Sequence, residues 1–185
     1  MSELASPGQL RAALLRWTLL FSPLLLLLGF LSGAVSGSGA GNPWFMDLTK
    51  PSLYPPPATF GIVWSILYLL MGLALAMIVT ARGAAGRGLA VAVFAAQFLL
   101  NLAWSPLFFA MHQISLALYL LAALDVVVIV TVILFFRVRP LAAWLMLPYL
   151  AWCLFATTLN WQFLEANPGA DGTDGGEPVA TVEFK

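Results

Sequence analysis

The sequence has very few charges: only 9% of its 185 residues are Asp, Glu, Lys or Arg, where soluble proteins have about a quarter. So few charges cannot cover a water-facing surface, and a net charge of zero excludes a basic nucleic-acid footprint. The single cysteine, Cys153, excludes an intramolecular disulfide, and one cysteine with one histidine argues against a zinc or di-iron site. Apolar residues are abundant instead, at 62% with a mean hydropathy of +0.95, which indicates that lipid surrounds most side chains.

Five apolar runs between the charges have the length that crosses a bilayer, about 20 residues at about 1.5 Å each. They cover residues 17–36, 59–81, 89–110, 114–136 and 141–164. In lipid every backbone N–H and C=O must be paired within the protein, which a helix does locally, and the period-two alternation of a membrane β-barrel is absent. The pattern predicts an all-α membrane protein, a single five-transmembrane-helix bundle over residues 1–164.

Arginines predict how the bundle is oriented. With five spans in turn, six of them fall on one side: Arg11 and Arg16 before the first run, Arg82 and Arg87 in the second loop, and Arg137 and Arg139 in the fourth. The other side receives only Lys50 and Lys185, so the positive-inside rule predicts a cytoplasmic N-terminus if the membrane is the plasma membrane. The first run could alternatively be a secretory signal peptide, because arginines precede its leucine-rich core and small residues follow it.

Two segments lie outside the runs. The loop 37–58 is rich in glycine and proline, which favour an extended or turned backbone over a helix, and long loops of this kind often act as lids. Residues 165–185 are rich in Gly, Asp and Glu, a composition that predicts a disordered acidic tail.

Three of the runs carry aromatic and amide side chains at helical spacing, so that each set shares one face. The sets are Phe60, Trp64, Tyr68 and Met71 on the second run, Gln97, Asn101, Trp104 and Phe108 on the third, and Pro148, Trp152, Phe155, Ala156 and Leu159 on the fifth. An unpartnered amide is costly in lipid, so these faces should point into the bundle. If they converge, they line a flat apolar cavity suited to planar hydrophobic ligands.

Other interpretations stay open at this point. Tryptophans gather at membrane interfaces regardless of function, which accounts for Trp17, Trp144 and Trp161 near span ends. For the deeper tryptophans the pattern alone does not separate ordinary helix packing from a ligand pocket.

Two titratable residues are candidates for a function. Asp125, the only acidic residue in mid-span, is either a functional carboxylate or a protonated, hydrogen-bonded structural residue. The structural reading is favoured, because no span carries a basic partner. His112 could bind a haem iron, but no second ligand is evident, so neither a metal site nor a catalytic residue is predicted.

Three motifs occur in order along the chain. The first runs through Trp44, Lys50-Pro51, Pro55-Pro56, Phe60, Trp64, Tyr68 and Met71-Gly72; the second is Gln97, Asn101, Trp104 and Phe108-Phe109; the third is PYLAWCLFATTLN, from Pro148 to Asn160. In this order and spacing they resemble the translocator protein family, also called tryptophan-rich sensory proteins or peripheral-type benzodiazepine receptors.

The resemblance implies a five-helix bundle, often a homodimer, that binds porphyrins and other planar hydrophobic molecules as ligands, with no obligatory cofactor. Carried over by position, the ligand-binding residues would be Ala34, Phe60, Trp64, Tyr68, Asn101, Trp104, Trp152, Phe155 and Ala156, and Trp44, Lys50 and Pro51 would belong to a lid loop. Leu53 and Ala58 stand where family members often have tryptophan, which puts the details of lid stacking in doubt. Cholesterol binding is not carried over, because no basic residue follows the fifth run.

The residues and the resemblance together leave three hypotheses about function. The first is a membrane receptor or sensor that binds porphyrins such as protoporphyrin IX and regulates tetrapyrrole or stress responses. The second is light-dependent porphyrin breakdown through tryptophan, in which Trp64 and Trp152 match the residues implicated in the family, since no acid–base pair or nucleophile is visible. The third is a transporter of tetrapyrroles or lipids, which fits poorly without an inverted repeat or several intramembrane charges.

Overall fold

The computed structural model describes residues 6–173, and this part of the chain contains helices and no strands. Five helices are long and apolar enough to span a membrane: α1 (Pro7–Val35), α3 (Pro57–Thr80), α4 (Arg87–Ser105) with its continuation η1 (Pro106–Ala110), α5 (Ile114–Val138) and α6 (Pro140–Ala166). The predicted five-helix membrane fold is confirmed. A short helix, α2 (Pro43–Asp47), lies between α1 and α3.

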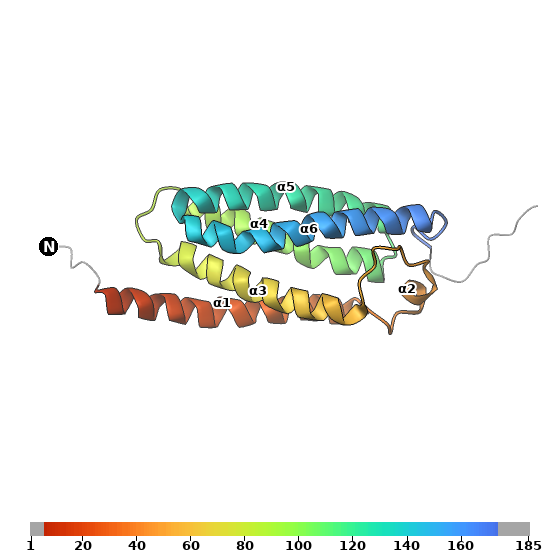
Figure 1. The fold of residues 1–185 in the computed structure, drawn as a ribbon, viewed down its shortest axis with the longest axis horizontal. Helices are drawn as coiled ribbons and strands as arrows, with labels where there is room; N and C mark the ends of the chain where they lie inside the picture. The colour runs from red at the N-terminus through yellow and green to blue at the C-terminus, as the bar shows by residue number, and fades with distance from the viewer. Residues whose placement is uncertain (1–5, 174–185) are drawn as a thin grey trace, which may run out of the picture.

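The helices lie nearly parallel in one elongated bundle (Figure 1). α1 packs mainly along α3, α3 packs on α6, α6 on α5 and α5 on α4, and α4 closes the arrangement against α3 and α1. The loop with α2 and the end of α6 lie at one end of the bundle, and the α3–α4 and α5–α6 connections lie at the other. The six arginines of the sequence prediction therefore all belong to the end opposite α2.

The first helix starts ten residues before the predicted run. Ser6 and Gln9 form a capping box, in which the Gln9 N–H donates to Ser6 Oγ and the Ser6 N–H donates to Gln9 Oε1, and Pro7 occupies the first helical position. Arg11 and Arg16 therefore lie within α1, and the prediction that they precede the helix is wrong.

Glycines allow α1 and α3 to approach closely. A Cβ atom on Gly72 of α3 would lie 2.4 Å from the Cα atom of Ser22 on α1, and one on Gly29 would lie 2.2 Å from the Tyr68 ring. Ser22 also donates through Oγ to the carbonyl oxygen of Leu69, at 3.2 Å. Small residues at helix contacts are typical of membrane proteins, where packing replaces the hydrophobic effect between helices.

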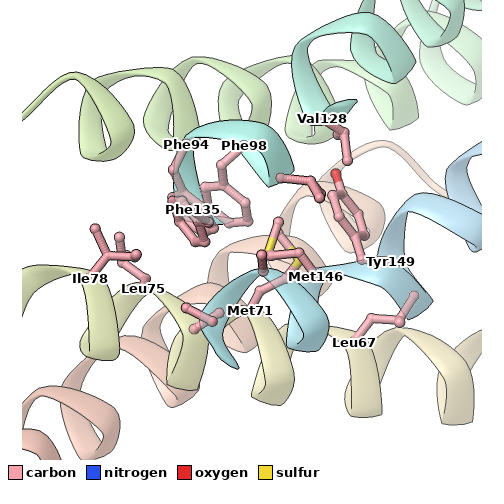
Figure 2. Packing of buried hydrophobic residues seen from close by; sticks show 14 of the residues in the cluster. Leu67, Met71, Leu75, Ile78, Phe94, Phe98, Val128, Phe135, Met146 and Tyr149 are labelled. Carbon is pink, nitrogen blue, oxygen red and sulfur yellow. The ribbon is translucent and has the colours of Figure 1, made fainter. Parts of the chain in front are cut away.

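A dense core packs between the C-terminal half of α3 and the facing parts of α4, α5 and α6 (Figure 2). Met71 and Ile78 of α3 and Met146 of α6 have no exposed surface. Phe94 of α4 and Phe135 of α5 stack with ring centroids 5.9 Å apart. These side chains interlock four of the five long helices.

The end of the third span is a π-helix, η1, which the sequence analysis did not predict. Pro106 has no N–H to donate, and the Met111 N–H reaches back to the Pro106 carbonyl, at 2.9 Å, in the wider i to i−5 pattern. The extra residue in this turn buries both Phe108 and Phe109, although they are consecutive.

Two predictions about the segments outside the spans need correction. The composition of the loop 37–58 predicts no helix, but residues 43–47 form α2, because the Asn42 side chain accepts the Phe45 N–H at the N-terminus of the helix and Pro43 fits the first helical position. The predicted disorder from residue 165 is wrong for its first part, since α6 continues to Ala166 and residues 167–173 accept hydrogen bonds from Thr49 of the loop 37–58 and from Ser115 in the first turn of α5. Residues 174–185 of the predicted tail lie outside the described residues.

Candidate functional site

A cavity of about 670 Å³ lies in the half of the bundle next to α2. Its walls come from α1, α3, α4, η1 and α6, with Leu121 and Leu124 of α5 behind them, and the loop with α2 covers one end. All nine residues that the resemblance assigns to ligand binding line this cavity: Ala34, Phe60, Trp64, Tyr68, Asn101, Trp104, Trp152, Phe155 and Ala156. Helices far apart in the sequence thus bring these side chains together, and their role in binding stays a prediction.

Aromatic rings form most of the cavity wall. Trp64 stacks on Tyr68 with ring centroids 5.1 Å apart, and it meets Trp152 edge to face at 6.5 Å. Trp152 also contacts the Phe60 ring at 5.9 Å. Each ring is fixed by another in the arrangements that aromatic pairs prefer, so the wall offers broad apolar surfaces that are already ordered.

The opposite wall is built on α4 and η1. Trp104 stacks on Phe108 with ring centroids 5.1 Å apart, and its Nε1–H donates to Asn160 Oδ1 of α6 at 3.2 Å. The Asn160 amide in turn donates to the carbonyl oxygen of Ile114, at 2.9 Å. In the sequence Asn160 is only the last residue of a motif, and its place in the wall depends on this contact between separate helices.

The polar groups of the cavity are largely paired with one another. The Tyr68 hydroxyl donates to Asn101 Oδ1 at 3.0 Å, across α3 and α4. Gln97, one helical turn below Asn101, does not line the cavity but accepts a hydrogen bond from the buried Tyr149 hydroxyl, at 2.8 Å. Paired polar groups present little that is unsatisfied, so the cavity suits a ligand that is mainly apolar.

The loop with α2, which the sequence predicts to be a lid, packs against this wall. Trp44 is buried and stacks on His112 with ring centroids 4.4 Å apart, while Phe45 lines the cavity and meets Phe109 edge to face at 5.1 Å. Asn42 anchors the start of α2, because its Nδ2 donates to the carbonyl oxygen of Phe109 at 3.0 Å. Of the three predicted lid residues, Lys50 lines the cavity, whereas Trp44 and Pro51 lie in the lid outside the lining.

Lys50 folds back under α2. Its ammonium donates to the carbonyl oxygens of Leu48 at 2.9 Å and of Phe45, and it lies 4.3 Å from the centroid of the Phe45 ring. Burial lowers the pKa of this ammonium from its usual value, and the nearby Asp47 carboxylate opposes the shift. Lys50 is the one charged side chain among the described residues that line the cavity, and it places a positive charge at the lid.

Residues that the sequence analysis did not assign to the site complete the lining. Gly29 and Gly33 lie beside Ala34 on α1, and Tyr54 of the lid loop and Phe163 of α6 contact each other edge to face, with centroids 5.8 Å apart. The sequence alone does not mark these residues as part of the cavity, because most of the chain is equally apolar.

Asp125 stands outside the cavity lining and has a hydrogen-bond partner on α6, and its structural role stays a prediction. The Thr157 hydroxyl lies 2.7 Å from Asp125 Oδ2 and 3.1 Å from the carbonyl oxygen of Cys153. The Thr157 hydroxyl donates its one proton to Asp125 Oδ2 or shares it with the Cys153 carbonyl oxygen, so α6 supplies a hydrogen bond to this carboxyl group. Among the described residues no group of three or more His, Cys, Asp or Glu side chains comes together as a metal site would require.

Comparison with known proteins identifies the relatives of this arrangement. The TspO/MBR family matches residues 21–165, which include the second half of α1 and the other four spans to within one residue of the end of α6. The translocator protein of Sus scrofa is 40% identical over 146 residues, covering 78% of this chain and 86% of the relative. The tryptophan-rich protein TspO of Chlorobaculum tepidum is 36% identical over 146 residues (78% and 92%), and the tryptophan-rich sensory protein of Cereibacter sphaeroides is 35% identical over 147 residues (77% and 91%). The chain belongs to the TspO/MBR family.

Proposed function

We propose that this protein is a membrane sensor that binds a porphyrin, or another planar hydrophobic molecule, in the cavity beneath the lid. The observation that supports this most is the cavity itself, in which Trp64, Trp104 and Trp152 from three helices surround one volume of about 670 Å³. Pockets for small molecules have volumes of about 300–1,000 Å³ and are lined mainly by apolar and aromatic side chains. The names of the relatives, which include a tryptophan-rich sensory protein, support the sensor role.

The chemistry of the wall favours this class of ligand. Ring faces stack on other flat π systems, and the few polar groups are already paired within the wall. Lys50 supplies a positive charge at the lid, where it would attract the carboxylates that porphyrins such as protoporphyrin IX carry. The ligand would therefore lie with its ring among the tryptophans and its anionic edge toward the lid.

Quenching of tryptophan fluorescence by protoporphyrin IX in detergent tests the proposal. We expect saturable quenching by the unchanged protein and a loss of affinity of at least tenfold in the double variant Trp64→Ala, Trp152→Ala. The matched control is Trp144→Ala, Trp161→Ala, because these two tryptophans are 60% and 50% exposed on the bundle surface and line no part of the cavity. Equal affinity in the two double variants would show that the porphyrin binds elsewhere.

Light-dependent porphyrin breakdown is the second candidate, and the Trp64–Trp152 contact at 6.5 Å favours it. Two indoles in contact at the cavity wall could pass an electron to an excited ligand. The test compares bleaching of bound porphyrin in light and in darkness, for the unchanged protein and for Trp64→Phe. Bleaching that is no faster than with an unrelated membrane protein would eliminate this activity and leave the sensor proposal intact.

Orientation and assembly also belong to the proposal. The arginine-rich end would face the cytoplasm and the lid end the opposite side, so a ligand would enter from outside the cytoplasm. Labelling of single cysteines introduced at Arg82 and at Leu53, in a Cys153→Ala background, would show on which side of the membrane each end of the bundle lies. The homodimer that the resemblance implies stays a prediction, which the mass of the protein in detergent would test.

A further inference from the structure

The segment after α6 runs back along the lid end of the bundle. It comprises residues 167–173 and follows the part of the chain that matches the family, which ends at residue 165. We name residues 167–173 the strap. Gly172 occupies the left-handed region in it, with φ of +74°, and makes the turn that brings the strap onto the α4–α5 connection.

One end of the strap holds the lid through Asn167. The Thr49 N–H donates to Asn167 Oδ1 at 2.7 Å, and Asn167 Nδ2 donates to the Thr49 carbonyl oxygen at 3.1 Å. The same Nδ2 also donates to the carbonyl oxygen of Phe163 within α6, at 2.9 Å. One amide thus satisfies both backbone groups of Thr49 and ties them to the last turn of a transmembrane helix.

The contact falls at a sensitive point of the lid. Thr49 lies between Leu48, which is buried, and Lys50, whose ammonium holds the carbonyl oxygens at the end of α2. The start of α2 is fixed separately, by the hydrogen bond from Asn42 to Phe109. Asn167 therefore ties the segment just after α2 to the end of α6, as Asn42 ties the start of α2 to η1.

The other end of the strap is fixed to the fourth span. The Ser115 N–H donates to Asp171 Oδ1 at 3.0 Å, and the Ser115 hydroxyl donates to the second carboxylate oxygen. The Gly172 N–H donates to the carbonyl oxygen of His112, at 2.8 Å. A carboxylate at the first turn of α5 is favourable because it meets unpaired N–H groups and the positive end of the helix dipole.

We propose that the strap positions the lid over the cavity and that Asn167, as a positioning residue, sets how fast ligand enters and leaves. The part of this inference that concerns ligand exchange rests on the proposed function, because it requires that the cavity binds a ligand. None of the residues 167–173 of the strap lines the cavity, so the strap would not touch a ligand bound there. Releasing it should therefore speed association and dissociation together and change the equilibrium affinity little.

Backbone amide hydrogen exchange of residues 44–51 tests the strap without any ligand, on the full-length protein in detergent. Loss of two hydrogen bonds should raise lid opening, and so the exchange rate, about tenfold in Asn167→Ala. Asn167→Asp keeps the acceptor for the Thr49 N–H and should show a smaller increase. Thr173→Ala is the matched control, because it removes a hydrogen bond within the strap, from its hydroxyl to the Ala170 carbonyl, and none to the lid.

Stopped-flow mixing with protoporphyrin IX gives the second readout. We expect dissociation and association both to be about tenfold faster in Asn167→Ala and to be unchanged in Thr173→Ala. Asp171→Ala frees the other end of the strap and should move both rates in the same direction by less. Unchanged exchange in residues 44–51 of Asn167→Ala would overturn the inference, whereas a protein that binds no porphyrin but shows the faster exchange would contradict the proposed function alone.

Discussion

The two ends of α3 lie in two different environments, and the contrast divides the whole bundle. Toward its C-terminus, Met71, Ala74 and Ile78 have no exposed surface and meet the interlocked core of Figure 2. Toward its N-terminus, Phe60 and Trp64 are only partly buried and border the cavity. The same helix therefore contributes packing at one end and an open volume at the other.

The difference shows where stability and binding reside. In the packed half the side chains fill the space between the helices, so a substitution that shortens one of them leaves a void. In the cavity half, each large ring is held against the wall by another ring or by a polar partner, as Trp64 is by Tyr68 and Trp104 is by Asn160, so the volume between the walls stays open. A change in the packed half should therefore affect folding, and a change in the cavity half should affect ligand affinity.

The largest expected effect follows from emptying the packed half. Phe135→Ala removes a ring that has no exposed surface and stacks on Phe94, and it should lower the free energy of unfolding by about 3–5 kcal/mol. Thermal unfolding in detergent is the measurement. Trp152→Ala removes a larger ring from the wall of an existing cavity and should cost clearly less. Equal losses in the two variants would show that the cavity half is as tightly packed as the other.

A pair of glycines on α3 gives the next effect. Gly72→Ala places a Cβ atom 2.4 Å from the Ser22 backbone and should destabilise the protein by about 1–3 kcal/mol, because α1 has to move away from α3. Gly61→Ala, at the cavity end of the same helix, meets nothing within 4 Å and should be neutral or slightly stabilising. Melting temperatures of the two variants compare the halves directly, and a harmless Gly72→Ala would mean that the α1–α3 contact is loose.

Hydropathy and motifs predict the five spans and the residues of the cavity, but they do not predict where α1 and α2 start. The five spans are readable because lipid demands long apolar helices, and the nine cavity residues came from a resemblance that preserves spacing. The start of α1 was also readable, since Ser6 and Gln9 have the capping-box spacing, and Asn42-Pro43 is a comparable signal for α2. These two helix starts were missed because hydropathy and overall loop composition outweighed local capping signals.

Other features depend on contacts that no local pattern specifies. Asn167 reaches Thr49 across 118 positions of the sequence, and Asp171 reaches Ser115 across 56. A glycine- and acid-rich composition is equally typical of a free tail, so the strap could not be distinguished from one. The π-helix depends in the same way on Phe108 and Phe109 both finding space inside the bundle, which Pro106 permits but does not require.

The smallest expected effect concerns the positive charge of Lys50 at the lid. It distinguishes the contribution of this charge to ligand affinity from that of the apolar wall. Because burial lowers the pKa of Lys50 from its usual value, raising the pH through the alkaline range should convert this ammonium to the neutral amine before an ordinary lysine is converted. An anionic porphyrin would then lose an attraction of about 1 kcal/mol and bind about fivefold more weakly. The stability of the lid should move in the opposite direction, since burial penalises the charged form in the folded protein and deprotonation removes that penalty.

Lys50→Arg provides the control, because a guanidinium keeps its charge throughout this range. Its porphyrin affinity, measured by the same fluorescence titration, should stay level where the unchanged protein declines. An uncharged planar ligand should show no pH dependence with either protein, because it meets only the aromatic wall. If the Arg variant declined as steeply as the unchanged protein, the pH effect would come from the ligand or from another group, and Lys50 would act only by holding the end of α2 through the carbonyl oxygens of Phe45 and Leu48.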